Sequence, residues 1–218
     1  MDELKKLCKK YDELQSLHGS KELNSIYFGG CINEPDICFV FMNPTKRNIA
    51  SSKDWKGIRS PWIGTKNSWD LFYKLKLIED SLYDKIKSIK GTDWTEEFAK
   101  EVYESIEKNK IFITNLAKCT QLDARELPNS VFENYLELFY KEMDIIKPKT
   151  IILFGNQVSS IILKEKISVS QNRKKEFILN NKYKCYSVYY PVGNGRFNMD
   201  KSIEDIKYIM KEYYGKNI

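Results

Sequence analysis

The chain has 218 residues, of which 42% are hydrophobic and 13% aromatic, so it is expected to fold around a sizeable core and not to be disordered. No apolar run reaches the roughly 18–20 residues that a membrane-spanning helix needs, and the polar N-terminal residues lack the apolar stretch of a secretory signal. The formal net charge of +6 is compatible with a phosphate-bearing partner but identifies none by itself.

The arrangement of cysteine and histidine disfavours several kinds of catalytic site. The five cysteines are scattered and contain no Cys-x-x-Cys pair, which predicts reduced thiols in a cytoplasmic protein. His18 is the single histidine, so neither a Ser-His-Asp hydrolase nor a histidine-rich metal site is expected. Cys31 and Cys38 lie seven residues apart, but no second pair matches them. We therefore predict no metal site and no cofactor.

Apolar periodicity predicts strands and helices that alternate along the chain. In chain order we expect a helix at 3–17, a strand at 37–42, helices around 66–77 and at 95–108, a strand at 111–114, a helix at 130–146, a strand at 150–154, a helix at 156–164, a strand at 184–190 and a helix at 200–214. This order predicts an α/β fold with three α/β/α layers and a central, mostly parallel four-stranded sheet. No repeat or linker interrupts it, so residues 1–218 are expected to form a single, monomeric domain.

The most informative segment is the run Cys38–Thr45. Five apolar residues end abruptly in Asn-Pro, which predicts a buried strand that opens into a turn, because proline biases the preceding residue away from helix and cannot continue the pairing. Two cations, Lys46 and Arg47, follow at once. In an open α/β sheet such a loop lies at the carboxyl edge, where ligands bind. A strand that simply ends in a polar turn is the alternative explanation.

Polar residues also follow the other expected strands, and parallel strands end along one edge of a sheet. Asn115 follows the second strand, Gly155 the third, and the segment 191–196 the fourth. Trp62 lies between a proline and a glycine in the segment that joins the first two strands. Neutral amides, one flat ring and peripheral cations suit the recognition of a flat heterocycle on a phosphate backbone.

Four segments resemble, in this order, motifs of the uracil-DNA glycosylase superfamily, and the resemblance spans about residues 37–200. Phe41–Thr45 is similar to the Asn-Pro-Ser form of the first motif in mismatch-type members, and Pro61–Gly64 is similar to a Pro-Phe-Val-Gly segment whose aromatic ring stacks on the extruded base. Ile113–Cys119 is similar to an Ile-Thr-Asn-Val-Val-Lys-Cys stretch of the iron–sulfur branch. Pro148–Gly155 is similar to a Pro-Lys-hydrophobic-Leu-Gly strand that the superfamily shares. The resemblance implies the fold of that superfamily and a uracil-type DNA glycosylase of base excision repair.

Three positions depart from the pattern of the superfamily. Phe41 stands where the first motif usually has glycine. Of the four cysteines of the iron–sulfur branch only Cys119 is in place, and Tyr135 stands about where the fourth would fall, so a cluster is not expected. The last motif reads Tyr190-Pro191 in place of His-Pro-Ser or Asn-Pro-Ser. Because the catalytic histidine is absent, we expect a slow enzyme.

The resemblance and the expected strand ends together assign a role to each candidate residue. The expected catalytic residues are Asn43 and Tyr190, the base-binding residues are Met42, Trp62 and Asn115, and the DNA-phosphate contacts are Thr45, Lys46, Arg47, Gly155, Asn194 and Arg196. Asn43 would position water, and Tyr190 would donate its hydroxyl to the base oxygen that gathers charge. The loop 192–197 would probe the duplex. The expected partner is DNA, either single-stranded or a mismatched duplex.

Other readings of these residues stay open. The alternatives are a cap of the next turn for Asn43, core packing for Trp62 and Tyr190, and hydrogen bonds to loop amides for Asn115. The basic stretch 164–184 predicts either a solvated hairpin face or a contact with the DNA backbone. Two other functions are also compatible with the sequence: an inactive nucleic-acid-binding member of the superfamily, and a hydrolase or transferase of free nucleosides or nucleotides.

Overall fold

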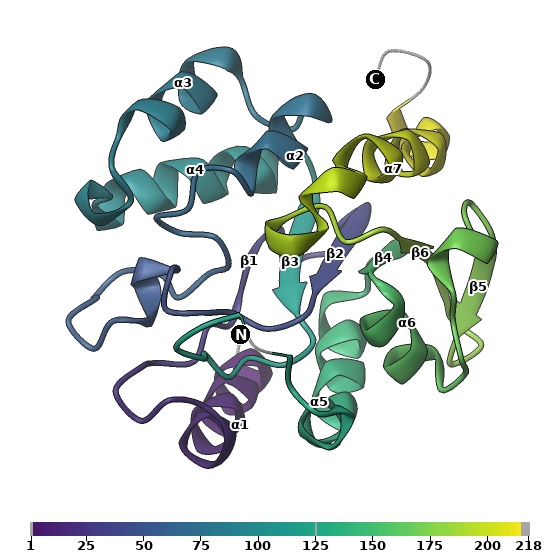
Figure 1. The fold of residues 1–218 in the computed structure, drawn as a ribbon, viewed down its shortest axis with the longest axis horizontal. Coiled ribbons are helices and arrows are strands. Elements are labelled where there is room, and N and C mark those ends of the chain that lie inside the picture. Colours follow the sequence, from purple (N-terminus) through teal and green to yellow (C-terminus); the bar gives the residue numbers. More distant parts are fainter. Residues whose placement is uncertain (1, 125, 215–218) are drawn as a thin grey trace.

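A computed structural model describes residues 2–124 and 126–214, and its centre is a six-stranded sheet with the order β1-β3-β2-β4-β6-β5 (Figure 1). The strands are β1 (Phe28–Gly30), β2 (Ile37–Phe41), β3 (Ile111–Asn115), β4 (Thr150–Phe154), β5 (Glu176–Leu179) and β6 (Tyr183–Val188). The four central strands, β3, β2, β4 and β6, are parallel, whereas β1 and β5 pair antiparallel at the two edges. The four predicted strands are therefore confirmed as the parallel centre of a larger sheet.

The two edge strands have weaker sequence signals than the central ones. Each of β2, β3 and β4 is buried along its whole length, which explains its continuous apolar run. The short strand β1 contains Gly29 and Gly30, and glycine is depleted in strands. Gly29 lacks a side chain for a packing reason, because a Cβ there would lie 2.1 Å from the ring of Tyr103. The strand β5 is largely exposed, so its sequence lacks a buried pattern.

The predicted helices at 3–17, 95–108, 130–146, 156–164 and 200–214 are confirmed within about two residues. The helices are α1 (Asp2–His18), α2 (Trp69–Lys74), α3 (Asp80–Ser88), α4 (Glu96–Lys108), α5 (Asn129–Ile146), α6 (Asn156–Leu163) and α7 (Met199–Tyr214). The helix expected around 66–77 is shorter than predicted, since Lys76 adopts a φ of 56° just beyond its end. Helix α3 was not predicted, and it buries only Leu82 and Ile86. None of the helices within the described residues is long and apolar enough to cross a membrane.

The helices cover both faces of the sheet, as the layers in Figure 1 show. Successive side chains of a strand point to opposite faces. Phe39 and Phe41 accordingly belong to a core with α2, α3, α4 and α7, while Cys38 and Val40 belong to a second core with α1, α5 and α6. The predicted three-layer α/β/α architecture is thus confirmed.

The turn between α5 and β4 starts the second half of the sheet. Lys147 adopts a left-handed conformation with φ 54°, and its N–H donates to the carbonyl of Met143. Pro148 follows directly and cannot continue the helix. The chain therefore reverses into β4, beside β2, and places the carboxyl ends of both strands at the same edge.

Candidate functional site

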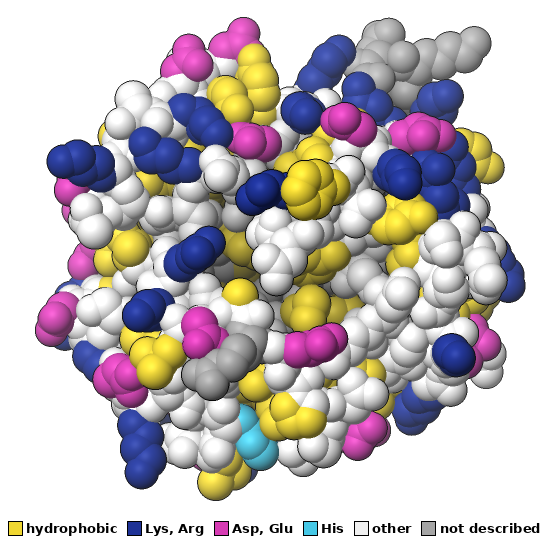
Figure 2. Space-filling view, in the orientation of Figure 1, with side chains coloured by type: hydrophobic (Ala, Val, Ile, Leu, Met, Phe, Trp, Pro, Cys, Tyr) yellow, Lys and Arg dark blue, Asp and Glu magenta, His cyan; other side chains and the backbone are white. Residues whose placement is uncertain are grey.

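A cleft of about 1660 Å³ lies where the parallel strands end. Figure 2 shows one face of the molecule, hollowed near its centre, with hydrophobic side chains in the hollow and Lys and Arg side chains around it. Residues from the loop 42–49, the segment 61–68, the end of β3 and the segment 190–199 line the cleft. Every site residue predicted from the sequence contributes to this lining except Gly155.

The loop after β2 is fixed to the loop after β3. The backbone N–H of Gln121 donates to the carbonyl of Pro44 at 3.1 Å, and the N–H of Lys46 donates to the carbonyl of Gln121 at 2.8 Å. The side-chain nitrogen of Asn43 donates to the carbonyl of Pro44 at 3.2 Å. Asn48 caps the helical turn that follows, η1 (Ile49–Ser51). The capping role considered for Asn43 therefore belongs to Asn48.

Trp62 has a φ of 68°, in the left-handed region that is rare for a bulky residue. Its carbonyl accepts hydrogen bonds from the N–H of Thr65 at 3.0 Å and from Nε1 of Trp69 at 3.2 Å. The hydroxyl of Tyr103 donates to the carbonyl of Pro61, the preceding residue. Neighbouring contacts thus fix a backbone conformation that costs free energy, as is common at functional sites. Sequence reasoning missed Trp69 and Tyr103, because both have the pattern of ordinary core residues.

Four aromatic rings meet beneath and beside the cleft. The ring of Phe41 is buried and stacks on Phe154 at 4.3 Å, with an interplanar angle of 10°. Its other neighbours are Trp62 at 5.0 Å and Tyr190 at 6.1 Å, both nearly perpendicular to it. Trp62 and Tyr190 are half-buried, and each packs against the core while it also lines the cleft. Phe41, in the place of the usual glycine, therefore supports both rings from below.

Asn115 ends β3 and is 2% exposed. Its side-chain nitrogen is buried and has no hydrogen-bond partner among residues 2–124 and 126–214, and the same is true of Nε1 of Trp62. A buried donor without an acceptor is rare and costs about 1–3 kcal/mol. Both residues line the cleft, so an acceptor on a bound molecule would satisfy them.

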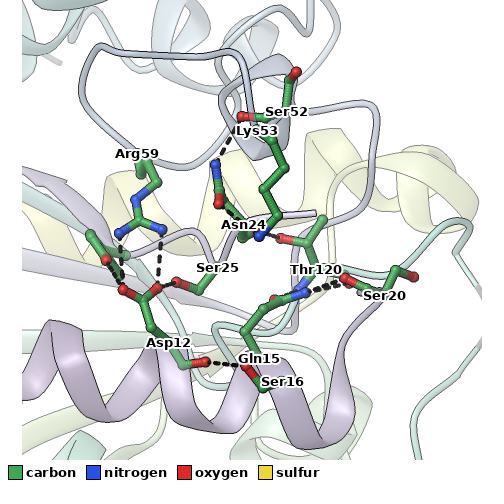
Figure 3. A network of polar contacts seen from close by, with 11 residues as sticks. Asp12, Gln15, Ser16, Ser20, Asn24, Ser25, Ser52, Lys53, Arg59 and Thr120 are labelled. Atoms are coloured by element: carbon green, nitrogen blue, oxygen red, sulfur yellow. Dashed lines mark hydrogen bonds and ion pairs between the residues drawn. The ribbon is translucent and has the colours of Figure 1, made fainter. Parts of the chain in front are cut away.

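Helix α1 anchors two of the segments beside the cleft, as Figure 3 shows. The carboxylate of Asp12 accepts two hydrogen bonds from the guanidinium of Arg59, at 3.0 and 3.2 Å. The side-chain oxygen of Gln15 accepts from the N–H of Thr120 at 2.7 Å. The first contact fixes the start of the segment that carries Trp62, and the second fixes the loop after β3.

The structure places Gly155 behind Tyr190 and outside the cleft lining. Gly155 has a φ of 89°, and a Cβ added to it would lie 3.6 Å from Cβ of Tyr190. The left-handed φ, and not crowding, is what requires glycine here, and the expected phosphate contact of Gly155 stays a prediction without support from the cleft lining. Burial raises the pKa of Tyr190 well above its ordinary value. The hydroxyl is protonated at neutral pH, as that of a tyrosine with an ordinary pKa also is, and can donate a hydrogen bond.

Exposed cations lie along the cleft. Lys46 and Arg47 follow β2, and Arg196 lies in the 3-10 helix η4 (Gly193–Asn198), beside the exposed Asn194. We call Lys46, Arg47 and Arg196 the cationic rim. The guanidinium of Arg196 lies 4.9 Å from the ring centre of Phe197, which is 82% exposed. Charge and an exposed aromatic ring thus occur together at the mouth of the cleft.

The basic stretch 164–184 is arranged differently from the cationic rim. Its ion pairs join Arg173 to Glu204 and Asp205, Lys174 to Glu204, Lys182 to Asp144, and Lys184 to Glu176. These contacts neutralise much of the stretch within the fold. The solvated hairpin is therefore the better of the two explanations for it.

The cysteines do not provide a metal site within the described part of the chain, where no three His, Cys, Asp or Glu side chains could hold a metal ion together. Cys119 is buried, and burial raises the pKa of its thiol, whereas a metal ligand must be a thiolate. Burial also raises the pKa of the neighbouring Tyr135. Both residues belong to the core between the sheet, α1 and α5.

Comparison with known proteins agrees with this geometry. The family model described as the uracil DNA glycosylase superfamily matches residues 30–211, a range that includes the parallel centre of the sheet and the residues that line the cleft. No curated protein matches the chain. The match implies a DNA substrate and a function of the DNA glycosylase type. The chain therefore belongs to the uracil-DNA glycosylase superfamily.

Proposed function

We propose that the protein hydrolyses the N-glycosidic bond of a deaminated or mispaired base, such as uracil, in DNA. The observation that carries this proposal is the buried amide of Asn115, which lines the cleft and whose nitrogen has no acceptor within the described residues. Uracil presents an oxygen acceptor, O4, beside a donor, N3–H, and an amide matches both. Cytosine presents the opposite pattern, so it would leave polar groups unpaired in the pocket.

The base must leave the helical stack before it can enter such a pocket, at a cost of a few kcal/mol. Stacking on the ring of Trp62 would recover about 1–3 kcal/mol. The exposed ring of Phe197 has the position and the chemistry to fill the gap that an extruded base leaves, since apolar side chains insert between base steps in this way. A mispaired or single-stranded base costs least to extrude, which favours such substrates.

The chemistry that we propose relies on neutral groups. Cleavage of the glycosidic bond builds positive charge on the sugar and negative charge on the departing base, and catalysis depends on stabilising that state. The hydroxyl of Tyr190, which lines the cleft and is protonated at neutral pH, would donate to the charged base oxygen. Asn43 would orient the attacking water, but an amide cannot act as a general base. The expected enzyme is therefore slow.

The size and charge of the cleft favour a DNA strand over a free nucleoside as the substrate. Pockets for small molecules usually occupy about 300–1,000 Å³. The cleft occupies about 1660 Å³ and borders the cationic rim, which provides contacts for phosphates on either side of the bound base.

An inactive, DNA-binding protein is the second candidate function. One observation favours it: the buried ring of Phe41 lies against Trp62 and Tyr190, where the family pattern has glycine. The side chain takes up space below the rings that would enclose the base. A Phe41→Gly variant that gains cleavage, while the parent binds DNA without cleaving it, would identify this case.

The proposal is tested by incubating the protein with oligonucleotides that carry uracil, hypoxanthine, xanthine or a G·T mismatch, followed by alkali. Alkali-dependent strand breaks in the parent, strongly reduced in Asn115→Ala, support a glycosylase that reads the base through Asn115. Binding without breaks supports the inactive protein. Release of base from free nucleosides alone would contradict a DNA substrate.

A further inference from the structure

A buried charged network lies directly behind the candidate base-reading residue. Nζ of Lys118 lies 3.1 Å from Oε1 of Glu142, on α5. The hydroxyl of Thr114 donates to the same oxygen at 2.7 Å, and the hydroxyl of Tyr11, on α1, donates to Oε2 at 2.7 Å. Nζ of Lys118 also donates to the backbone carbonyl of Asn115 at 2.6 Å. The network therefore connects two helices to the last residue of β3.

Both charges of the network are withdrawn from water. The side chain of Lys118 is 1% exposed and that of Glu142 is 0% exposed. Burial lowers the pKa of Lys118, and the adjacent carboxylate of Glu142 opposes that fall. A buried ion pair seldom stabilises a protein more than apolar side chains of similar volume would, so it is weak evidence for a stabilising role. A role in fixing one local geometry accounts better for its presence here.

The backbone at the end of β3 is held from two directions. The N–H groups of Leu116 and Ala117 donate to the carbonyls of Phe41 and Met42, at 2.8 and 3.0 Å. The carbonyl of Asn115 belongs to the same peptide group as the N–H of Leu116, so the bond from Lys118 holds that group from its opposite side. This peptide group is attached to Cα of Asn115, so its hydrogen bonds restrain the backbone from which the Asn115 side chain projects. The side-chain nitrogen itself has no hydrogen-bond partner within the described residues.

We propose that the Lys118–Glu142 pair positions the amide of Asn115 and thereby sets the preference of the cleft for one base. Lys118 and Glu142 act here as positioning residues, through the backbone of Asn115, and do not touch the substrate. The inference rests on the proposed function, because it assumes that Asn115 reads the base. Lys118 and Glu142 do not line the cleft, and the inference makes the choice of base depend on both of them.

The test uses a chain with Lys118→Met and Glu142→Gln, which we call the charge-free pair. This combination removes both charges and leaves no unpaired buried ion. The charge-free pair should lower kcat/KM on a uracil-containing single strand by at least about tenfold, the effect of one mispositioned buried hydrogen bond. In an Asn115→Ala chain the same two substitutions should change kcat/KM less than about twofold, because interacting positions are not additive. Equal losses in both backgrounds would overturn the inference.

A second ion pair, of which the carboxylate is buried, provides the control for a general loss of stability. Asp205, on α7, is buried and accepts three hydrogen bonds from Arg173, but it does not contribute to the cleft lining. Asp205→Asn should leave kcat/KM on the uracil-containing single strand unchanged at a temperature where the variant is folded. A fall in kcat/KM as large as that of the charge-free pair would contradict a specific positioning role.

A spectroscopic measurement decides the inference without catalysis. The side-chain amide of Asn115, identified by its disappearance in Asn115→Ala, should give one sharp pair of ¹⁵N–¹H resonances in the parent. In the charge-free pair these resonances should shift or broaden, whereas in Asp205→Asn they should not. Unchanged resonances in the charge-free pair would refute the positioning role even if the parent cleaves uracil. A parent that cleaves no base would refute the proposed function, and the resonances would then decide the inference alone.

Discussion

Replacing Lys118 by methionine alone should destabilise the protein far more than replacing Lys118 and Glu142 together. The single change leaves the carboxylate of Glu142 buried, with two hydroxyl donors but no cation. Removing one partner of a buried pair typically costs about 3–5 kcal/mol, whereas replacing both partners is often neutral. For a chain of this size each kcal/mol lowers Tm by roughly 2–4 °C. We therefore expect Lys118→Met to lower Tm by about 6–20 °C.

The assay is thermal unfolding followed by circular dichroism at pH 7, with urea titrations at 25 °C to compare the midpoints directly. The charge-free pair should recover most of the loss, to within about 1.5 kcal/mol of the parent. If the single and the double variant lost the same stability, Lys118 would contribute by packing alone. A loss of less than about 1 kcal/mol in Lys118→Met would show that the two charges are not buried together in solution.

Four further predictions follow from the cleft. Asn43→Ala should lower the single-turnover rate on the order of 10²-fold and leave the Kd for an uncleaved strand within about twofold; an unchanged rate would make Asn43 a turn residue. Trp62→Phe removes an unpaired buried donor, so it should raise the free energy of unfolding of the free protein by about 1 kcal/mol in urea titrations. The same change should weaken binding to a uracil-containing strand. A variant less stable than the parent would contradict the assignment of an unpaired donor to Trp62. Contacts of the cationic rim with about three phosphates should give a slope of roughly −3 for log affinity against log salt on duplex DNA, and a flat dependence would exclude rim contacts. Glu142→Gln removes the carboxylate that opposes the lowering of the Lys118 pKa by burial. Between the lowered pKa of the folded protein and the ordinary value of 10.5, the unfolded chain then binds more protons than the folded one. The free energy of unfolding of this variant should therefore rise with pH toward 10.5 more steeply than that of the parent.

The sequence predicted the part of the fold that is built from fully buried strands. Runs such as Ile37–Phe41 and Thr150–Phe154 are apolar because both of their faces are covered, so they are conspicuous in the sequence. Strand β1 lacks that signal, since Gly29 is selected by the close approach of Tyr103 and not by strand propensity. The extra strands and α3 lie at the periphery, where burial and therefore sequence pattern are weak.

The sequence also predicted which loops converge, because parallel strands end at one edge whatever their side chains are. It could not predict how the side chains within those loops are supported. The pair Lys118–Glu142 joins positions 24 residues apart, and Asp12–Arg59 joins positions 47 apart. Such partners are set by the packing of α1 and α5 on the sheet. For the same reason the sequence could not decide between a solvated hairpin face and a DNA contact for the basic stretch 164–184, because Glu204 on α7 pairs with Arg173 and Lys174 from a distant part of the chain.

Under the proposed function, the cleft combines neutral catalytic groups with firmly restrained recognition groups, and the two properties are related. In the proposed mechanism the catalytic side chains of Asn43 and Tyr190 are neutral, so they would provide less acceleration than a carboxylate or an imidazole. Selectivity between bases depends on the difference in transition-state free energy and not on the absolute rate. The left-handed backbone of Trp62 and the buried charges behind Asn115 both cost free energy, and both fix a group that lines the cleft. Such restraints raise the penalty for a base that fits poorly, because the site cannot relax around it. For the proposed glycosylase we therefore expect discrimination between bases to be favoured over speed of cleavage.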